Sequence, residues 1–287
     1  MELKLGVMAA LSGAGAADPA VTARFVSLLE ELGCESVWAV EHVVMPGDYA
    51  SRYPYDPAGR MGLAATDDVP DPLHWLTFAA AHTQTLRLGT AMLILPEHQP
   101  ATLAKRLATL DVLSGGRLLA GIGVGWLREE YDALGVPFEH RGARADEYLE
   151  AMRALWTGDP ASYHGRYVTF DNVHSRPRPV RGTVPIVVGG HSVASVRRAA
   201  RYGAGWYPLG VRGDEFTGLL DRLRAECETL GRDPADVEVT MRAPGNRAEL
   251  ETLRSLGVGR VVIRADPRDP VDVRDKIRWY QREVLKV

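Results

Sequence analysis

The sequence predicts an α/β fold, a (β/α)₈ TIM barrel built as a single domain by residues 1–287. Short apolar runs alternate with amphipathic segments of helical period along the whole chain. Strands that alternate with helices form a parallel sheet buried on both faces. The chain is close to the roughly 250 residues typical of such a barrel, and it shows no break in composition. These observations favour a closed barrel over an open doubly wound sheet.

The expected strands lie, in chain order, at 3–9, 36–40, 86–93, 118–123, 184–188, 205–209, 237–242 and 260–264. The expected helices lie at 19–32, 72–82, 101–113, 143–156, 193–202, 215–230, 247–256 and 271–284. An extended loop rich in Pro, Gly, Tyr and Asp follows the second strand at 43–71. We interpret it as a lid or substrate wall, because loops after barrel strands build the binding face. A small insertion near 159–183 contains a β-like stretch at 164–170.

Composition excludes several classes of function. The net charge is −3, and no basic stripe supports binding to nucleic acid. The chain shows no apolar run of membrane-spanning length and no secretory signal at its start, so we expect a cytoplasmic protein without membrane contact. Two distant cysteines, Cys34 and Cys227, form neither a disulfide framework nor a metal site. No zinc-hydrolase motif occurs, and we expect no metal.

Glycines recur at alternate positions where the fourth expected strand ends, at Gly121, Gly123 and Gly125. The third glycine comes one residue too early for a Rossmann fingerprint, which we therefore reject. Glycines at a strand exit let a flat ring or a phosphate tail approach the backbone. Close packing at the strand end is the alternative.

Two glycines also end the fifth expected strand, before His191 and Ser192 open a helix. Free N–H groups at a helix N-terminus, aided by the helix dipole, form a phosphate site. An ordinary N-cap is the alternative interpretation.

Glu41 and His42 follow the second expected strand directly. Histidine is the side chain best suited to exchange protons near neutral pH. At a strand exit, His42 would face the barrel mouth, where it is either a catalytic or cofactor-contacting group or a simple loop histidine. In the third expected strand, small residues lead into Met92, which forms either core packing or an apolar plate beneath a ligand ring.

Linked segments in consistent order resemble the luciferase-like monooxygenase superfamily. The segments are Glu41-His42, 88–91 (LGTA), Pro100 with 103–105, 109–117 (TLDVLSGGR), 121–126 (GIGVGW), 185–190 (PIVVGG) with Ser192, 198–201 and Gly205-Trp206. The likeness spans most of residues 1–210. The segments Glu130-Tyr131, Leu134-Gly135 and Arg141-Gly142 are most similar to the branch that uses the deazaflavin coenzyme F420.

The resemblance implies a flavin or deazaflavin ring at the carboxyl mouth of the barrel, backed by a non-prolyl cis peptide at Ala91–Met92. It implies proton transfer at His42, a phosphate site at 189–192 and contacts to the ribityl chain at 123–126. The cofactor-binding residues implied are Glu41, Thr90, Ala91, Met92, Gly123, Val124, Gly125, Trp126, Tyr131, Gly189, Gly190, His191 and Ser192. Trp126 departs from the sugar-phosphate dehydrogenase branch, in which the matching residue is a proton-donating acid.

We therefore expect an oxidoreductase that transfers a hydride between F420 and a small organic substrate. The alternatives are an FMN-dependent luciferase-like monooxygenase and a non-catalytic barrel that binds flavin or deazaflavin. The superfamily also implies a homodimer.

Overall fold

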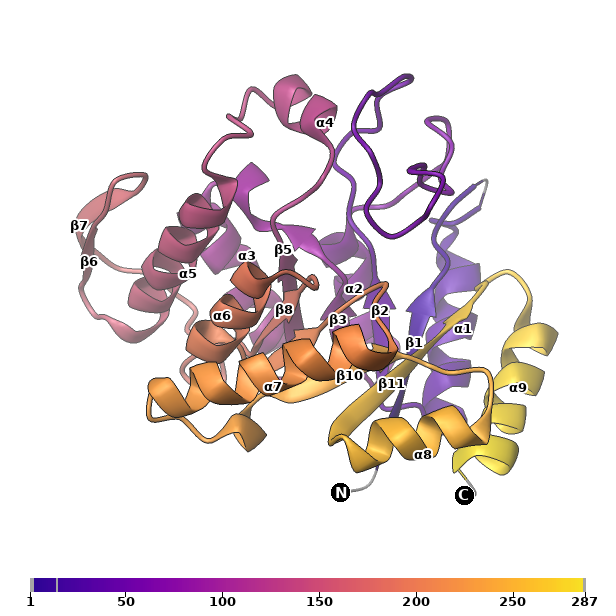
Figure 1. Cartoon of the computed structure of the whole chain (residues 1–287). Helices are drawn as coiled ribbons and strands as arrows, with labels where there is room; N and C mark the ends of the chain where they lie inside the picture. The colour runs from indigo at the N-terminus through magenta and orange to yellow at the C-terminus, as the bar shows by residue number, and fades with distance from the viewer. Residues whose placement is uncertain (1–2, 14, 286–287) are drawn as a thin grey trace.

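The computed structural model describes residues 3–13 and 15–285 and has a central barrel of strands surrounded by helices (Figure 1). Its strands are β1 (Lys4–Ala9), β2 (Ser36–Ala39), β3 (Arg87–Thr90), β4 (Leu93–Ile94), β5 (Leu118–Gly123), β6 (Ala161–His164), β7 (Thr169–Val173), β8 (Ile186–Gly189), β9 (Gly205–Tyr207), β10 (Glu238–Arg242) and β11 (Val258–Ala265). Its α-helices are α1 (Pro19–Glu31), α2 (Pro72–Ala81), α3 (Pro100–Leu113), α4 (Arg128–Ala133), α5 (Arg141–Thr157), α6 (Val193–Tyr202), α7 (Gly213–Thr229), α8 (Arg247–Ser255) and α9 (Pro270–Trp279). Short 3₁₀ turns, η1 (Leu95–Glu97) and η2 (Pro234–Asp236), and a π-helical end, η3 (Tyr280–Leu285), complete the described elements.

The barrel strands are parallel and lie in the order β3-β2-β1-β11-β10-β9-β8-β5. The ring closes because β3 also pairs with β5, with Leu88 opposite Leu118. Strand β4 pairs with the later part of β5, so β3 and β4 together occupy one barrel position. This closed arrangement confirms the predicted (β/α)₈ barrel.

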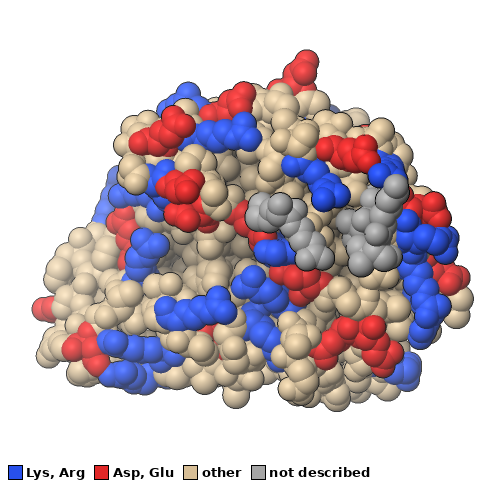
Figure 2. Space-filling model, turned by 90° about the horizontal axis from the view of Figure 1, so that it is seen from below, with Lys and Arg blue, Asp and Glu red and all other residues tan. Residues whose placement is uncertain are grey.

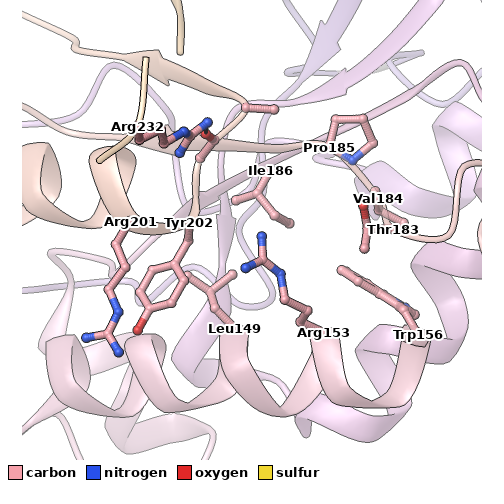
Figure 3. A pocket seen from close by; sticks show the side chains of 12 residues that line it. Leu149, Arg153, Trp156, Thr183, Val184, Pro185, Ile186, Arg201, Tyr202 and Arg232 are labelled. Atoms are coloured by element: carbon pink, nitrogen blue, oxygen red, sulfur yellow. Dashed lines mark hydrogen bonds between the residues drawn. The ribbon is translucent and has the colours of Figure 1, made fainter. Parts of the chain in front are cut away.

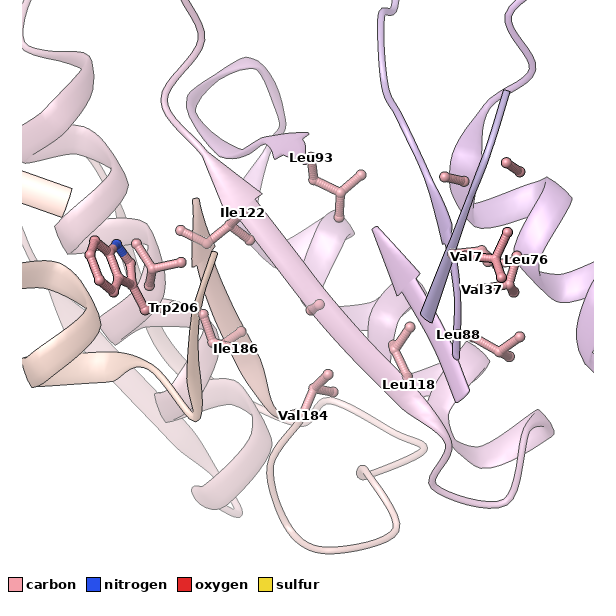
Figure 4. Packing of buried hydrophobic residues seen from close by; sticks show 14 of the residues in the cluster. Val7, Val37, Leu76, Leu88, Leu93, Leu118, Ile122, Val184, Ile186 and Trp206 are labelled. Atoms are coloured by element: carbon pink, nitrogen blue, oxygen red, sulfur yellow. The ribbon is translucent and has the colours of Figure 1, made fainter. Parts of the chain in front are cut away.

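Side chains alternate between the two faces of each barrel strand, as the period of a β-strand requires. Val37 and Leu118 point outward into the core beneath the helices (Figure 4). Their neighbours Trp38 and Leu119 belong to a separate cluster inside the barrel. Trp38 fills this interior because β3 carries Gly89 beside it, where a Cβ would lie 2.3 Å from the indole ring.

Several helices begin at a residue that caps them. At α1, the Asp18 carboxylate accepts a hydrogen bond from the backbone N–H of Val21, and Pro19 occupies the first helical turn. The same Asp-Pro sequence starts α2, where Asp71 accepts from the N–H of His74. Because these helices follow β1 and β2 in the chain, their capped N-termini lie at the carboxyl ends of the strands. This is the end of a barrel that carries the binding loops.

The structure differs from the sequence prediction in three places. The continuous strand expected at 86–93 is wrong, because the chain leaves the sheet at Ala91 and Met92 and splits into β3 and β4. The short helix α4 was not expected. The helix expected at 271–284 ends at Trp279 and continues as the π-helical η3.

The two predicted interruptions are both present. Residues 43–71 form turns and bends between β2 and α2, and the insertion near 159–183 contains the antiparallel hairpin β6–β7. Lys and Arg are interspersed with Asp and Glu on the face opposite the loop-bearing end (Figure 2). No helix in the described part of the chain is both long and apolar enough to cross a membrane.

Candidate active site at the barrel mouth

The residues predicted to form the site follow different strands but lie at one end of the barrel. Glu41 and His42 come just after β2, residues 123–126 follow β5, and residues 189–192 follow β8. In Figure 1, α4 and the loop at 43–71 lie above this end of the strands. We call this end of the barrel the mouth.

The imidazole of His42 is fixed by a carboxylate from the next part of the mouth. Its Nδ1 lies 2.8 Å from Oε2 of Glu130 in α4, and the two side chains are 10% and 2% exposed. The other oxygen of Glu130 accepts hydrogen bonds from the backbone N–H groups of Val43, at 2.7 Å, and Val44, at 3.3 Å. Because an ionised carboxylate only accepts, Nδ1 carries the proton, and in the neutral ring Nε2 is the basic nitrogen.

Glu41 is directed to a different part of the mouth. Its Oε2 accepts a hydrogen bond of 2.6 Å from the backbone N–H of Ile94, and both carboxylate oxygens lie 3.1 Å from Nε2 of His98. Glu41 is only 4% exposed. These contacts hold the chain where it re-enters the sheet after Ala91 and Met92.

A third carboxyl group, that of Glu97 in η1, lies near these two. Its Oε2 is buried and receives no hydrogen bond from any residue among 3–13 and 15–285. Burial and the negative charges of Glu130 and Glu41 raise the pKa of Glu97 to about 9. At neutral pH this carboxyl group is therefore neutral.

The glycines of β5 and β8 face Met92. A Cβ at Gly189 would lie 2.6 Å from Met92 Cγ, and one at Gly123 would lie 3.3 Å from Met92 Cβ. The peptide bond between Ala91 and Met92 is cis, as the resemblance implied. Met92 thus lies at the top of the barrel interior, where it packs against the cluster that contains Trp38.

Thr90 and Tyr131 are buried behind the mouth. Thr90 is fully buried, and its hydroxyl donates to the carbonyl of Gly121 at 2.7 Å. The hydroxyl of Tyr131, also fully buried, donates to the carbonyl of Val124 at 2.8 Å. Both side chains hold backbone in the predicted cofactor loop, and neither exposes a polar atom that is free of these contacts.

The loop after β5 turns at Gly125, which has a φ of 68°. A Cβ there would lie 2.9 Å from the ring of Tyr131, so glycine is required both by the turn and by this close approach. Arg141 of α5 donates from Nε to the Gly125 carbonyl at 3.2 Å. Tyr131 and Arg141, which belong to segments that resemble the F420 branch, therefore pack against and hydrogen-bond to the predicted cofactor loop.

The loop after β8 has the features of an anion site. Gly190 has a φ of 102°, and the hydroxyl oxygen of Ser192 caps α6 by accepting from the N–H of Ser195 at 3.1 Å. Residues 192–194 are exposed, so the first turn of α6 is open to solvent. Nδ1 of His191 is buried and without a partner among the described residues. A phosphate at this helix N-terminus would find donors and an unpaired imidazole nitrogen.

Tyrosines of the loop at 43–71 join the cofactor loops across the mouth. Tyr53 packs edge-on against Trp126 and Tyr55, with ring centroids 5.1 Å and 5.2 Å apart. Tyr55 in turn packs against His191 at 5.4 Å, and Tyr49 against Trp126 at 5.5 Å. The loop therefore extends from the β5 side of the mouth to the β8 side, consistent with the predicted lid.

Two neighbouring acids of α4 tie this loop to the barrel. Glu130 binds the start of the loop, as described above. Glu129 accepts from the backbone N–H groups of Ala50, at 2.6 Å, and Ser51, at 3.1 Å. Burial raises the pKa of Glu129, but hydrogen bonds from Ser51 and from backbone N–H groups outweigh it and lower the value to about 2. Glu129 is thus an ionised anchor for the loop.

A cavity of about 390 Å³ lies away from the mouth, near the amino ends of β8 and β9 and against α5 and α6 (Figure 3). Arg232 in its wall donates to the backbone carbonyls of Ala200 and Gly203, and Arg201 pairs with Glu150.

Among the described residues, no group of three or more His, Cys, Asp or Glu side chains is arranged to hold a metal ion.

Sequence reasoning missed the two glutamates that shape the mouth. It did not mention Glu97, and it named Glu130 only as part of a family-like segment and not as a site residue. Glu130 contacts His42 across 88 positions of sequence, so no local pattern connects them. The segment 109–117, by contrast, is structural. Asp111 accepts from the N–H of Val180, and Arg117 donates to the carbonyl oxygens of Ala80 and Leu86.

Comparison with known proteins finds relatives that match most of this chain. An uncharacterised protein of Mycobacterium tuberculosis is 35% identical over 262 residues, which cover 88% of this chain and 89% of that protein. The FMNH2-dependent dimethylsulfone monooxygenase of Pseudomonas putida is 30% identical over 193 residues, which cover 65% of this chain and 52% of the enzyme.

Among solved structures, the coenzyme F420-dependent tetrahydromethanopterin reductase of Methanopyrus kandleri superposes with a TM-score of 0.77. It is 17% identical, and the match covers 100% of this chain and 99% of the reductase. At this identity the likeness concerns the fold. The family model for luciferase-like monooxygenases matches residues 4–245. The chain therefore belongs to the luciferase-like monooxygenase family.

Proposed function

We propose that this protein is an F420-dependent oxidoreductase that transfers a hydride between the deazaflavin and a small organic substrate. The observation that carries the proposal is the pairing of His42 with Glu130 at the mouth. Glu130 lies in a segment that resembles the F420 branch, and its carboxylate holds an imidazole next to the loops predicted to bind the cofactor. A proton donor or acceptor at this position is what hydride transfer to or from a carbonyl or alcohol requires.

The residues of the mouth fit a flavin-type cofactor. The open first turn of α6 and the unpaired Nδ1 of His191 would hold a phosphate, with Gly189, Gly190 and Ser192 forming the loop around it. Residues 123–126 would lie along the ribityl chain, and Ala91 and Met92 would support the ring from below. When bound, the deazaflavin supplies or accepts the hydride.

We assign Glu41, Thr90 and Tyr131 a positioning role behind these contacts. Their polar atoms are engaged with the backbone of Ile94, Gly121 and Val124, as described above. They would fix the shape of the cofactor loops without touching the cofactor.

His42 would move the proton. Glu130 accepts from Nδ1, which leaves Nε2 as the atom that accepts a proton from a substrate hydroxyl or returns it to a substrate oxygen. The pairing also limits rotation of the ring, so Nε2 keeps one direction. The loop at 43–71 would exclude water and, with its tyrosines and Trp126, form the wall of a substrate site suited to apolar or aromatic molecules.

An FMN-dependent monooxygenase is the second candidate. The specific observation in its favour is the 30% identity to the FMNH2-dependent dimethylsulfone monooxygenase. Both cofactors carry a phosphate and a tricyclic ring, so the same loops would bind either.

Binding of F420 and FMN, measured separately by ring fluorescence, tests the proposal. We expect F420 to bind more tightly than FMN and to support turnover with hydride acceptors. Tighter binding of FMN would move the protein to the monooxygenases, and binding of neither would refute the cofactor assignment. Binding without turnover of any substrate would favour a carrier.

A matched pair of cap variants tests the phosphate site. Ser192→Ala should weaken F420 binding about tenfold, the value of one hydrogen bond to a charged group. Asn246→Ala removes a similar N-cap from α8, where Asn246 accepts from the N–H of Glu249, and should leave F420 affinity unchanged. Equal loss of affinity in both variants would place the phosphate elsewhere.

A further inference from the structure

Three carboxyl groups come together at the mouth, but only two of them have hydrogen-bond donors. Glu130 is bound by His42 and two backbone N–H groups, and Glu41 by His98 and the N–H of Ile94. Oε2 of Glu97 is buried and has no donor within residues 3–13 and 15–285. Three ionised carboxylates in one buried cluster repel one another, so the group without donors is the one that retains a proton.

The groups around Glu97 do not offer it a positive charge. The elements packed against η1 and its neighbours contribute Glu41, His42, His98, Glu130, Tyr131, Arg141, Arg144 and Tyr148. Arg144 donates to the carbonyl oxygens of Pro137 and Glu139, and Arg141 donates to that of Gly125. Both guanidinium groups are therefore engaged away from Glu97.

We propose that Glu97 is a proton-holding residue of the mouth: it stays a neutral carboxylic acid at neutral pH, so the cluster that it forms with Glu41 and Glu130 carries two negative charges there and not three. The inference deepens the proposed function, on which its catalytic consequence rests. Glu130 and Glu41 orient the imidazoles of His42 and His98, and a third negative charge beside them would repel both carboxylates and disturb these contacts. Glu97 acts through these two carboxylates and is thus a positioning residue.

The proton on Glu97 has a consequence for stability that needs no cofactor. The unfolded chain loses this proton near pH 4.3, whereas the folded protein keeps it up to a pH of about 9. Between these values the native state binds more protons than the unfolded state, so stability falls as the pH rises. In Glu97→Gln, which has a similar shape and no ionisation, this contribution is absent.

The first experiment therefore measures the unfolding equilibrium of the wild type and Glu97→Gln by denaturant titration at pH 6, 7 and 8. We expect the ratio of their unfolding constants, wild type over variant, to increase about tenfold per pH unit. A ratio that does not change with pH would show that Glu97 is already ionised in the folded protein and would overturn the proposal.

A control variant separates this effect from the loss of any carboxyl group. Glu139 is exposed, and hydrogen bonds from Arg128 and from backbone hold its pKa below the usual range. The unfolding ratio for Glu139→Gln should thus stay level between pH 6 and 8. The ¹³C carboxyl resonance that is missing from Glu97→Gln should have the chemical shift of a protonated acid at pH 7, and the shift of a carboxylate would contradict the proposal.

The catalytic consequence is measured as the ratio of hydride-transfer rates, wild type over Glu97→Gln, at each pH. The ratio should stay constant between pH 6 and 8, where both proteins carry a neutral group at this position, and should change only as the pH rises past about 9, where the wild type gains a third negative charge. A ratio that changes between pH 6 and 8 would contradict the proposal. If the protein binds neither F420 nor FMN, the proposed function fails, but the unfolding ratio and the carboxyl shift still decide whether Glu97 holds a proton.

Discussion

The two ends of the barrel differ in how their buried charges are paired. Near the amino ends of the strands, Arg260 is fully buried and contacts Glu35 through two hydrogen bonds of 2.8 Å and 2.9 Å. It also pairs with Glu238 at 2.6 Å and donates to the hydroxyl of Thr240 at 3.1 Å. At the mouth, the ion pairs of Glu41 and Glu130 within the described residues are made with imidazoles.

The two kinds of pair respond differently to pH. A guanidinium group stays charged at every physiological pH, so the pairs around Arg260 are permanent. Imidazoles and a donor-free carboxyl group change charge within the range in which proteins work. The amino end of the barrel thus holds a fixed charge, whereas the groups at the mouth are suited to the proton exchange that the proposed function requires. Variants at the two ends should separate these roles.

The largest effect is expected at the mouth. His42→Ala should lower the rate of hydride transfer about 10²- to 10⁴-fold, the usual value of a positioned acid or base. The variant should also lose some stability, because the buried carboxylate of Glu130 then keeps only its backbone donors, so rates are compared in protein shown to be folded. Steady-state and stopped-flow rates test this, with His74→Ala, an exposed histidine, as the control. Full activity in His42→Ala would remove this residue from the mechanism.

At the opposite end, Arg260→Met should destabilise the protein by about 3–5 kcal/mol, because it leaves Glu35 and Glu238 without their buried partner. Denaturant unfolding measures this loss. Protein that remains folded should keep its cofactor affinity, since Arg260 lies far along β11 from the mouth. Arg278→Met, at an exposed position of α9, should stay within about 0.5 kcal/mol of the wild type. Similar stability in both variants would mean that the buried pairs contribute nothing.

Sequence reasoning predicted the frame of the barrel better than the contacts at its two ends. Alternation such as Val37 outside and Trp38 inside follows directly from the period of a strand, so the strands were predictable. The break at Ala91–Met92 was not visible as a pattern, because apolar and small residues continue through it from Leu88 to Leu93 with only Thr90 between them. Only the resemblance to a known family indicated an unusual peptide there.

The chemistry of the mouth depends on contacts between distant segments. His42 could be selected because it directly follows a strand, but its partner Glu130 lies in a short helix without a strong local pattern. Glu97 lies between Pro96 and His98 in a stretch that has no motif. Its carboxyl group is neutral because no described residue donates a hydrogen bond to its buried Oε2. The lack of a donor in the folded structure cannot be read from a sequence pattern.

The smallest expected effect is on stability, and it concerns Glu30, which lies at the opposite end of the barrel from Glu97. Burial alone would raise the pKa of Glu30, but hydrogen bonds from Thr85, Gln84 and Leu86, just before β3, lower it to about 2. The folded protein therefore releases this proton more readily than the unfolded chain, whose pKa is near 4.3. The stabilisation is complete above that value and is lost as the pH falls toward 2. Glu30→Gln should cost about 1 kcal/mol at pH 7.

The stability that Glu30→Gln loses relative to the wild type should shrink in unfolding titrations as the pH falls from 5 to 3. The stability that Glu97→Gln gains relative to the wild type should grow as the pH rises from 6 to 8. The opposite signs follow from the donors: Glu30 has backbone N–H groups that stabilise its charge, and Oε2 of Glu97 has none among the described residues. If both variants showed the same pH trend, hydrogen-bond donors would not be what separates the two ends of the barrel. Burial, which acts on both carboxyl groups in the same direction, would then be the dominant cause.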